Sequence, residues 1–222
     1  TKMRFAFATG HGSGKSASAG MLITWAISTC TNTKVVITAN TKAQLGGVTW
    51  PEMVKWVQSG LTADWFTINA ESIVASEEKY KYKCNVKMKT WSVHNAEAFA
   101  GSHNDKGRLI FIFDEASGIP DEVWRSVNGA FARKDVEIIF IALGNPTRRS
   151  GPFYECFYDI EKRKQWEAIK INIQNVEGAD PTFWEDIIAR YGADSDEMRI
   201  RVLGEFPNQD IDQFIPQEAI DK

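Results

Sequence analysis

Short runs of apolar residues recur along the chain, separated by longer segments of mixed character. Continuous runs of this kind are typical of strands in a parallel sheet whose two faces are both covered. Several of the segments between them have the length and apolar spacing of helices. The predicted strands span residues 4–8, 34–39, 108–113, 136–143 and 166–173, the last alternating like a strand nearer an edge, and the predicted helices span 16–30, 41–58 and 120–133. This order predicts an open, mostly parallel α/β sheet.

Local patterns add detail to the helices. The helix at 16–30 is apolar on nearly every side, so we expect it to be buried. Pro51 predicts a kink or a break within the helix at 41–58. Two further helices are predicted near the end of the chain from capping residues: one that starts at Asp180-Pro181 and stops at Gly192, and a short one capped by Asp194 with Glu197 that ends at Gly204.

The region from 60 to 108 is less regular, and residues 82–93 alternate well enough for one or two strands. Residues 79–89 (KYKYKCNVKMK) interleave lysines with aromatic and apolar residues. The favoured interpretation is an amphipathic edge strand with a solvated lysine face. The alternative is a strand whose lysines contact nucleic-acid phosphates.

Composition excludes several classes of protein. With 222 residues, of which 43% are hydrophobic and 25% charged, the chain is ordinary for a globular protein of one large or two small domains. A net charge of −3 argues against indiscriminate coating of nucleic acid, but permits a local basic patch. The distant cysteines Cys30, Cys84 and Cys156 favour a reducing compartment, and their spacing does not indicate a zinc site. No apolar run is long enough to span a membrane.

The clearest motif is ATGHGSGKS at residues 8–16, between a predicted strand and a predicted helix. Backbone N–H groups of a glycine-rich turn converge on phosphate oxygens, and the helix N-terminus adds a favourable dipole. The motif predicts that Lys15 reaches the β- and γ-phosphates of a nucleotide and that Ser16 binds Mg²⁺. The common pattern has glycine where this chain has Thr9, a freedom that Gly10 and Gly12 are expected to supply. The candidate nucleotide-binding residues are Gly10, His11, Gly12, Ser13, Gly14, Lys15 and Ser16; the alternative is a flexible loop that only resembles a phosphate loop.

The apolar run LIFIF at 109–113 ends in two carboxylates, Asp114 and Glu115. Strands of a parallel sheet deliver such terminal side chains to the crevice where ligands bind. We expect Asp114 to hold the Mg²⁺ shell beside Ser16, and Glu115 to orient or deprotonate the attacking water. Strand ends also carry solvated acids without function, so the assignment depends on the phosphate-loop motif.

The strand predicted at 136–143 runs directly into Gly144-Asn145-Pro146. A polar side chain at this strand end, Asn145, is placed to sense the γ-phosphate. A simple Asn-Pro turn is the alternative interpretation.

Together these motifs resemble the large terminase subunit of tailed bacteriophages and prophages, the ATPase that packages DNA into the procapsid. The resemblance covers most of the chain and is carried by ATGHGSGKS (8–16), VVITANTKAQ (35–44), AFAGSH (98–103), LIFIFDEASGIPDEVW (109–124), IALGNPTRRSGPFY (141–154) and LGEFP…FIP (203–216). It implies a P-loop NTPase with a RecA-like, ASCE-type, mostly parallel sheet flanked by helices. It also implies that Glu115 is the catalytic glutamate, that Asn145 belongs to a coupling motif, and that Thr41 and Gln44 fall in a helicase-like motif.

The resemblance implies an ATPase domain at 1–205 and, at 206–222, the start of a linker toward a C-terminal nuclease domain that this sequence lacks. No nuclease activity is therefore expected here. It implies ATP and Mg²⁺ as cofactors, and double-stranded DNA gripped through its backbone. It further implies a portal protein and a small terminase subunit as partners, a homo-oligomeric ring when assembled with a monomer possible in isolation, and a location in the host cytoplasm at the procapsid portal.

Three departures from the family pattern matter. Where some terminases carry arginine in the phosphate loop, this chain has His11, which either contacts phosphate or faces solvent. An arginine finger must then come from another subunit or from a candidate in this chain, among Lys106, Arg108, Arg148 and Arg149. The adenine-contacting segment usual before the first strand is missing, and the abrupt start at a strand is that expected of an excised domain.

Two other classes of function remain open on the sequence. A helicase-like or remodelling P-loop ATPase acting on nucleic acid would require a second RecA-like domain. A nucleotide-binding module without hydrolysis would bind ATP and never turn it over. The carboxylate pair at 114–115 argues against the second of these.

Overall fold

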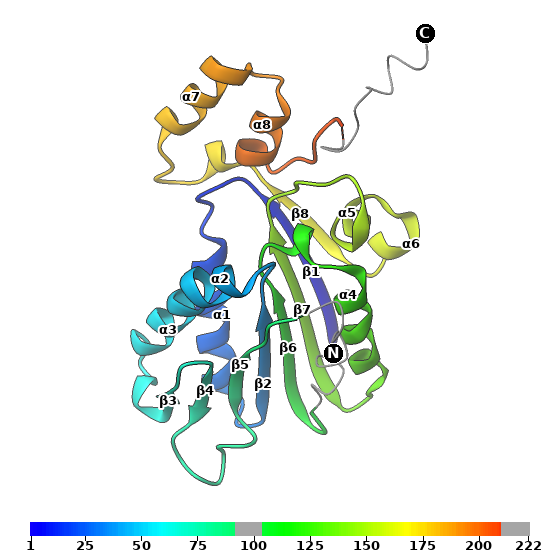
Figure 1. Cartoon of the computed structure of the whole chain (residues 1–222). Helices are drawn as coiled ribbons and strands as arrows, with labels where there is room; N and C mark the ends of the chain where they lie inside the picture. The colour runs from blue at the N-terminus through cyan, green and yellow to red at the C-terminus, as the bar shows by residue number, and fades with distance from the viewer. Residues whose placement is uncertain (92–103, 210–222) are drawn as a thin grey trace.

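The computed structural model of the chain describes residues 1–91 and 104–209 (Figure 1). The segment 98–103 and most of the predicted linker at 206–222 lie outside these residues. The strands are β1 (Lys2–Thr9), β2 (Thr33–Thr38), β3 (Phe66–Ile68), β4 (Ser72–Ala75), β5 (Asn85–Met88), β6 (Gly107–Phe113), β7 (Val136–Gly144) and β8 (Glu167–Ile171). The helices are α1 (Lys15–Thr29), α2 (Lys42–Gln44), α3 (Trp50–Gln58), α4 (Asp121–Asn128), α5 (Gly151–Tyr158), α6 (Ile160–Arg163), α7 (Pro181–Tyr191) and α8 (Asp196–Met198).

The strands form one eight-stranded sheet in the order β3-β4-β5-β2-β6-β7-β1-β8. All neighbours from β5 to β8 in this order are parallel, whereas the β3–β4 and β4–β5 pairs are antiparallel. The predicted mostly parallel α/β sheet flanked by helices is therefore confirmed. Strand β7 lies between β1 and β6, so the polar residues that follow these three strands meet at one edge of the sheet.

Alternate residues of the central strands pack into two separate cores, one on each face of the sheet. In β6, Ile110 and Ile112 face the side covered by α1 and α3, and Phe111 and Phe113 face the side covered by α4 and α5. Figure 1 shows α1–α3 on one side of the sheet and α4–α6 on the other, with α7 and α8 above the strand ends. Burial on both faces explains why β6 and β7 are apolar at almost every position.

Helix α1 is less buried than its composition predicts. Met21 and Trp25 are 46% and 44% exposed, so the expectation of a helix buried all round is wrong. The indole of Trp25 instead lies over the guanidinium of Arg108, 4.1 Å from the ring centroid. An aromatic face is a favourable surface for a cation, which gives this partly exposed residue a packing role.

The predicted interruption of the 41–58 helix lies just before Pro51 and takes the form of a π-helical turn, Leu45–Thr49. Pro51 follows this turn as the second residue of α3, and because proline has no N–H the regular helical hydrogen-bond ladder cannot continue through it. The turn matters for the site, because it ends at Thr49.

The prediction of an edge strand within 79–89 is wrong. Strand β5 is interior, between β2 and β4, and residues 79–84 form turns before it. Strands β3 and β4, which extend the sheet beyond β5, were not predicted because they are only three and four residues long.

The C-terminal helices follow the capping rules with one change. Asp180 accepts from the backbone N–H of Thr182 at the start of α7, and Gly192 ends that helix. Helix α8 is capped by Ser195 rather than Asp194, and a π-helical turn, Arg199–Leu203, carries the chain to Gly204. Within the described residues no helix is long and apolar enough to cross a bilayer.

Arg108 has a structural position at the start of β6. Its Nε donates to Glu137 Oε2 at 2.6 Å, and its Nη1 donates to Ala26 O at 3.1 Å and to Thr29 Oγ1 at 2.9 Å. It is 9% exposed and joins β6, β7 and the end of α1. Removal of a buried cation that makes several hydrogen bonds leaves its buried partners without a hydrogen-bond donor or a compensating charge.

We therefore expect Arg108→Ala to lower the free energy of unfolding by about 2–4 kcal/mol while leaving nucleotide affinity unchanged. Urea denaturation and nucleotide binding by anisotropy measure the two quantities. Lys106→Ala is the control, because Lys106 is exposed in the same turn, and its effect should stay within about 0.5 kcal/mol. An Arg108→Ala chain of normal stability that fails in ATP turnover would contradict this assignment.

Candidate nucleotide-binding site

The site lies at the carboxyl edge of the sheet, where β1, β7 and β6 end side by side. The glycine-rich loop follows β1, Asn145 follows β7, and the carboxylates Asp114 and Glu115 follow β6. This is the edge at which open parallel sheets bind ligands. The topology thus brings the three predicted segments to one place.

The glycine-rich loop gains its curvature from Gly12 and Gly14. Both have positive φ, 73° and 81°, and nothing lies within 4 Å of a Cβ built on either. Gly14 is the N-cap of α1, and no side chain caps the helix. Helix α1 therefore presents the unpaired amides of its first turn to the loop, as an anion site requires.

Gly10 serves the loop in a different way from that expected. Its φ is not positive, so it does not supply the freedom lost at Thr9. A Cβ at position 10 would lie 2.6 Å from the carbonyl oxygens of both Arg201 and Val202, so the position is restricted by close backbone packing. The N–H of Gly10 donates to Ile171 O at 3.3 Å.

His11 continues this packing. Its backbone N–H donates to Arg201 O at 2.8 Å, so this amide and that of Gly10 are bonded to protein carbonyls. Partial burial is the main cause that lowers the pKa of the His11 imidazole, with Lys15 and Arg201 adding to it and Glu197 opposing. The imidazole of His11 is therefore harder to protonate than that of a solvent-exposed histidine.

Gly204 closes the same junction from the C-terminal side. It has φ 65°, and a Cβ there would lie 2.6 Å from Ile171 O and 2.7 Å from Ala8 O. The residues from 173 to 204, here called the C-terminal lobe, therefore rest directly on the backbone of the phosphate loop. No sequence pattern predicted this contact.

Lys15 and Asn145 form the centre of the site. The Lys15 Nζ donates to Asn145 Oδ1 at 3.1 Å, and Asn145 Nδ2 donates to Thr9 O at 2.6 Å. Lys15 Nζ also lies 3.9 Å from Glu115 Oε1. Asn145 is 5% exposed and joins the end of β1 to the lysine. The simple-turn interpretation of Asn145 does not account for these side-chain contacts.

Glu115 has the one positive φ, 51°, among the non-glycine residues of the described chain. This left-handed conformation costs on the order of 1–2 kcal/mol and is found where a side chain must be aimed. Gly144 permits it, because a Cβ there would lie 2.9 Å from the backbone N of Ala116.

Burial raises the pKa of Glu115, and the neighbouring Asp114 adds to the rise. The ammonium of Lys15 and the backbone N–H of Asn145 oppose it. The carboxyl group thus sits in a partly desolvated place with a cation at hand, the environment in which a glutamate becomes a stronger base.

Asp114 is 2% exposed. Its Oδ2 accepts from Thr49 Oγ1 at 2.6 Å, and its Oδ1 accepts from the N–H of Glu115 at 3.0 Å. Among the described residues it has no ion-pair partner, which leaves a buried carboxylate without a compensating cation. Such charges are normally paired or bound to a metal.

The residues present fit a magnesium nucleotide. Asp114 and the Ser16 hydroxyl offer the hard oxygen donors that Mg²⁺ prefers, and Lys15 with the amides of α1 offers the cationic and dipolar surroundings that phosphates need. Thr41, by contrast, is an N-cap, since its Oγ1 accepts from the N–H of Gln44 at 3.0 Å.

The arginine-finger candidates separate into two groups. Arg108 and Lys106 stand at the start of β6, the opposite edge of the sheet from Lys15, and neither reaches the site. Arg148 and Arg149 follow β7 on the same edge as the site and are exposed. Arg149 donates to the carbonyl of Asn208.

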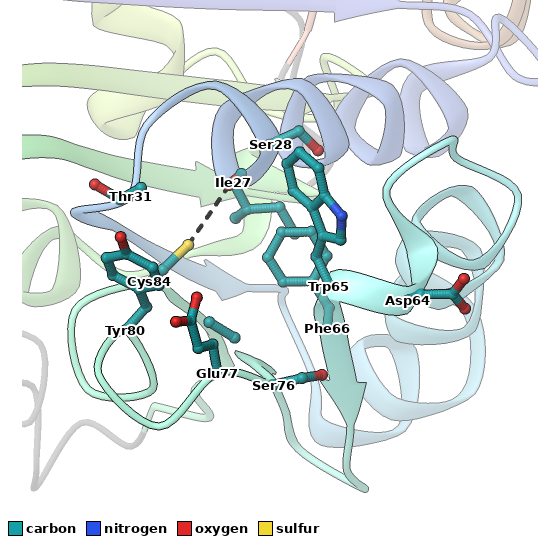
Figure 2. A pocket seen from close by; sticks show the side chains of 11 residues that line it. Ile27, Ser28, Thr31, Asp64, Trp65, Phe66, Ser76, Glu77, Tyr80 and Cys84 are labelled. Atoms are coloured by element: carbon teal, nitrogen blue, oxygen red, sulfur yellow. Dashed lines mark hydrogen bonds between the residues drawn. The ribbon is translucent and has the colours of Figure 1, made fainter.

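A cavity of about 410 Å³ lies at the other end of α1 from the glycine-rich loop and is shown in Figure 2. It is bounded by Ile27 and Ser28 of α1, by the aromatic residues Trp65 and Phe66, and by Cys84, whose Sγ donates to Ile27 O at 3.6 Å. Burial raises the pKa of the Cys84 thiol to about 11, so the thiol stays protonated at neutral pH. The cavity is remote from the loop and has no part in the site.

Comparison with known proteins agrees with the fold and the motifs. The protein-family model for the helicase domain of RNA cytidine acetyltransferase NAT10/TcmA matches residues 7–136, which is more than half of the chain. A probable terminase large subunit of Enterobacteria phage P7 is 27% identical over 226 residues, covering 96% of this chain and 44% of the relative. The chain thus spans less than half of the length of this curated relative.

Solved structures share the fold at low sequence identity. The large terminase of a thermophilic bacteriophage in complex with ADP has a TM-score of 0.67 and 12% identity, covering 93% of this chain and 48% of that one. The large terminase ATPase domain of Thermus phage P74-26 has a TM-score of 0.63 and 16% identity, covering 93% and 89%. The chain therefore belongs to the helicase-domain family that this family model describes; its fold is the RecA-like P-loop fold, and in sequence it is similar to the large terminase subunit of phage P7.

Proposed function

We propose that this chain hydrolyses ATP and that the hydrolysis drives double-stranded viral DNA into a procapsid. The observation that carries the proposal is the convergence of Lys15, Glu115 and Asn145 where three neighbouring strands end. The relative in phage P7 supports the packaging part of the proposal, because its name describes a terminase large subunit.

The roles of the residues follow from their positions. The loop from Gly12 to Ser16 binds the phosphates through amides and the Lys15 ammonium, with Gly10 and His11 fixing the loop against the C-terminal lobe. Glu115 orients a water molecule toward the γ-phosphate and accepts its proton. Ser16 and Asp114 would hold a Mg²⁺ ion, which would supply charge stabilisation for the transferring phosphoryl group.

Asn145 is placed to report the presence of the γ-phosphate. In this structure its amide oxygen accepts from Lys15, and a phosphate that engages Lys15 competes for that hydrogen bond. A change at Asn145 is passed to β1 through Thr9 O and to the loop after β7. Thr147 extends the link, since its Oγ1 donates to Ser117 Oγ at 3.0 Å.

The partners follow from the packaging role. We propose that copies of the chain form a ring on a portal protein in the host cytoplasm, with a small terminase subunit supplying the DNA. Arg148 or Arg149 then faces the site of a neighbouring copy, because the loop after β7 is exposed at this edge. DNA is held through its phosphates and without sequence preference.

The test is ATP turnover with and without double-stranded DNA of unrelated sequences, over a range of salt. We expect DNA of any sequence to stimulate turnover, and the stimulation to fall by at least about tenfold between roughly 50 and 200 mM salt. No turnover with any nucleic acid or portal partner would contradict the proposal.

A helicase-like ATPase is the second candidate, with which the family model that matches residues 7–136 is consistent. It predicts that single-stranded nucleic acid stimulates turnover and that duplexes are separated. Strand separation by the complete protein would select it over packaging.

A further inference from the structure

Thr49 makes a buried contact with Asp114 that neither the motifs nor the fold required. Thr49 is 1% exposed, and its hydroxyl donates to Asp114 Oδ2 at 2.6 Å. The other carboxylate oxygen accepts from the N–H of Glu115 at 3.0 Å. Both oxygens are therefore fixed, each with capacity left for a further partner.

The π-helical turn brings Thr49 to this position. Trp50 N–H donates to Leu45 O across five residues, the hydrogen bond that defines the turn. Leu45, Trp50 and Met53 are buried against the sheet, at 1%, 6% and 0% exposure. Thr49 is the polar member of this buried face, and such single π-helical turns often occur at functional sites.

Within the function proposed above, on which this inference rests, we propose that Thr49 is a positioning residue for magnesium. Its hydroxyl holds the Asp114 carboxylate in the orientation that presents the remaining lone pairs to the metal shell. Partners of this kind fix the direction of a ligand, and their loss typically weakens metal affinity about 10- to 100-fold.

A second buried threonine shows that this fold does not require every buried threonine hydroxyl to be hydrogen-bonded. Thr38 is 0% exposed, and among the described residues its hydroxyl has no hydrogen-bond partner. It pairs in register with Phe113, whose ring packs against Trp124 of α4, so it lies on the face away from Thr49. Thr38→Val is therefore a matched control for Thr49→Val.

The experiment measures the affinity of a fluorescent, non-hydrolysable ATP analogue in EDTA and through a Mg²⁺ titration. We expect Thr49→Val to raise the Mg²⁺ concentration at half effect by about tenfold or more, with affinity in EDTA unchanged. Thr49→Ser should keep the wild-type Mg²⁺ midpoint, because it retains the hydroxyl. Thr38→Val should keep it as well.

A folded Thr49→Val chain with the wild-type Mg²⁺ midpoint overturns the inference alone, as does a Thr49→Ser chain that loses as much as Thr49→Val. Thermal melting establishes folding. Should Thr49→Val not fold, Thr49→Ser and Thr49→Ala make the same comparison, because they differ only by the hydroxyl; equal midpoints in that pair overturn it. A wild-type chain that binds no nucleotide in either condition overturns the proposed function and this inference with it.

Discussion

Replacement of Glu115 by glutamine is expected to reduce ATP turnover by about 10²- to 10⁴-fold while leaving nucleotide affinity close to that of the wild type. The amide keeps the shape of the side chain but cannot accept a proton from water. The Oε1 atom of Glu115 lies 3.9 Å from Lys15 Nζ, but Glu115 is not part of the glycine-rich loop. Loss of its carboxylate should therefore leave nucleotide binding intact. Steady-state phosphate release and nucleotide anisotropy measure the two effects.

The same variant should not be less stable than the wild type. Burial raises the pKa of Glu115 in the folded chain, so its ionisation opposes folding, and that cost grows as pH rises through the folded pKa. Glutamine carries no charge, so Glu115→Gln should unfold at an equal or higher urea concentration at neutral pH, and the gain should vanish in acid. Glu161→Gln, on the exposed helix α6, is the control and should change neither turnover nor stability. Normal turnover in Glu115→Gln would remove Glu115 from the mechanism.

Replacement of Lys15 by alanine is expected to lower nucleotide affinity and turnover by about 10²-fold or more each. The ammonium is the cationic group at the centre of the site, bonded to Asn145 and close to Glu115. Lys15→Arg should not restore function, because the planar guanidinium presents its donors in a different geometry. Titration of the same fluorescent nucleotide and phosphate release provide the measurements.

Lys42→Ala is the control for Lys15→Ala, because Lys42 is an exposed lysine at the start of α2 and is not part of the glycine-rich loop. It should bind and hydrolyse ATP like the wild type. If Lys15→Ala also bound ATP with wild-type affinity, the loop would not be the phosphate site, and the nucleotide would have to bind elsewhere.

The parts of the site that the sequence predicted are those set by local rules. A strand of apolar residues ends at a defined point, so Asp114 and Asn145 could be placed at strand ends before the order of strands was known. The loop, too, is encoded locally, because Gly12 and Gly14 take the positive φ values that its turn requires.

The parts that the sequence did not predict depend on contacts between distant segments. The sequence allowed Arg108 to be the arginine finger, but the fold places it at the start of β6, in contact with Glu137 and Trp25. Thr49 became visible only once a π-helical turn brought it to Asp114, 65 residues away in the chain. Periodicity carries no information about such pairs, because each depends on how elements pack.

The contact of Gly10 and Gly204 with opposing carbonyl oxygens has a mechanical consequence. Side chains accommodate small displacements by changing rotamer, but two main chains in direct contact have no rotamers to change and pass the displacement on. A shift of the glycine loop must therefore move the C-terminal lobe as a body or rupture the His11–Arg201 hydrogen bond. Gly10 therefore transmits a displacement of the loop to the C-terminal lobe. An added methyl group at position 10 would clash with the carbonyl oxygens of Arg201 and Val202, even though every phosphate-binding atom would remain intact.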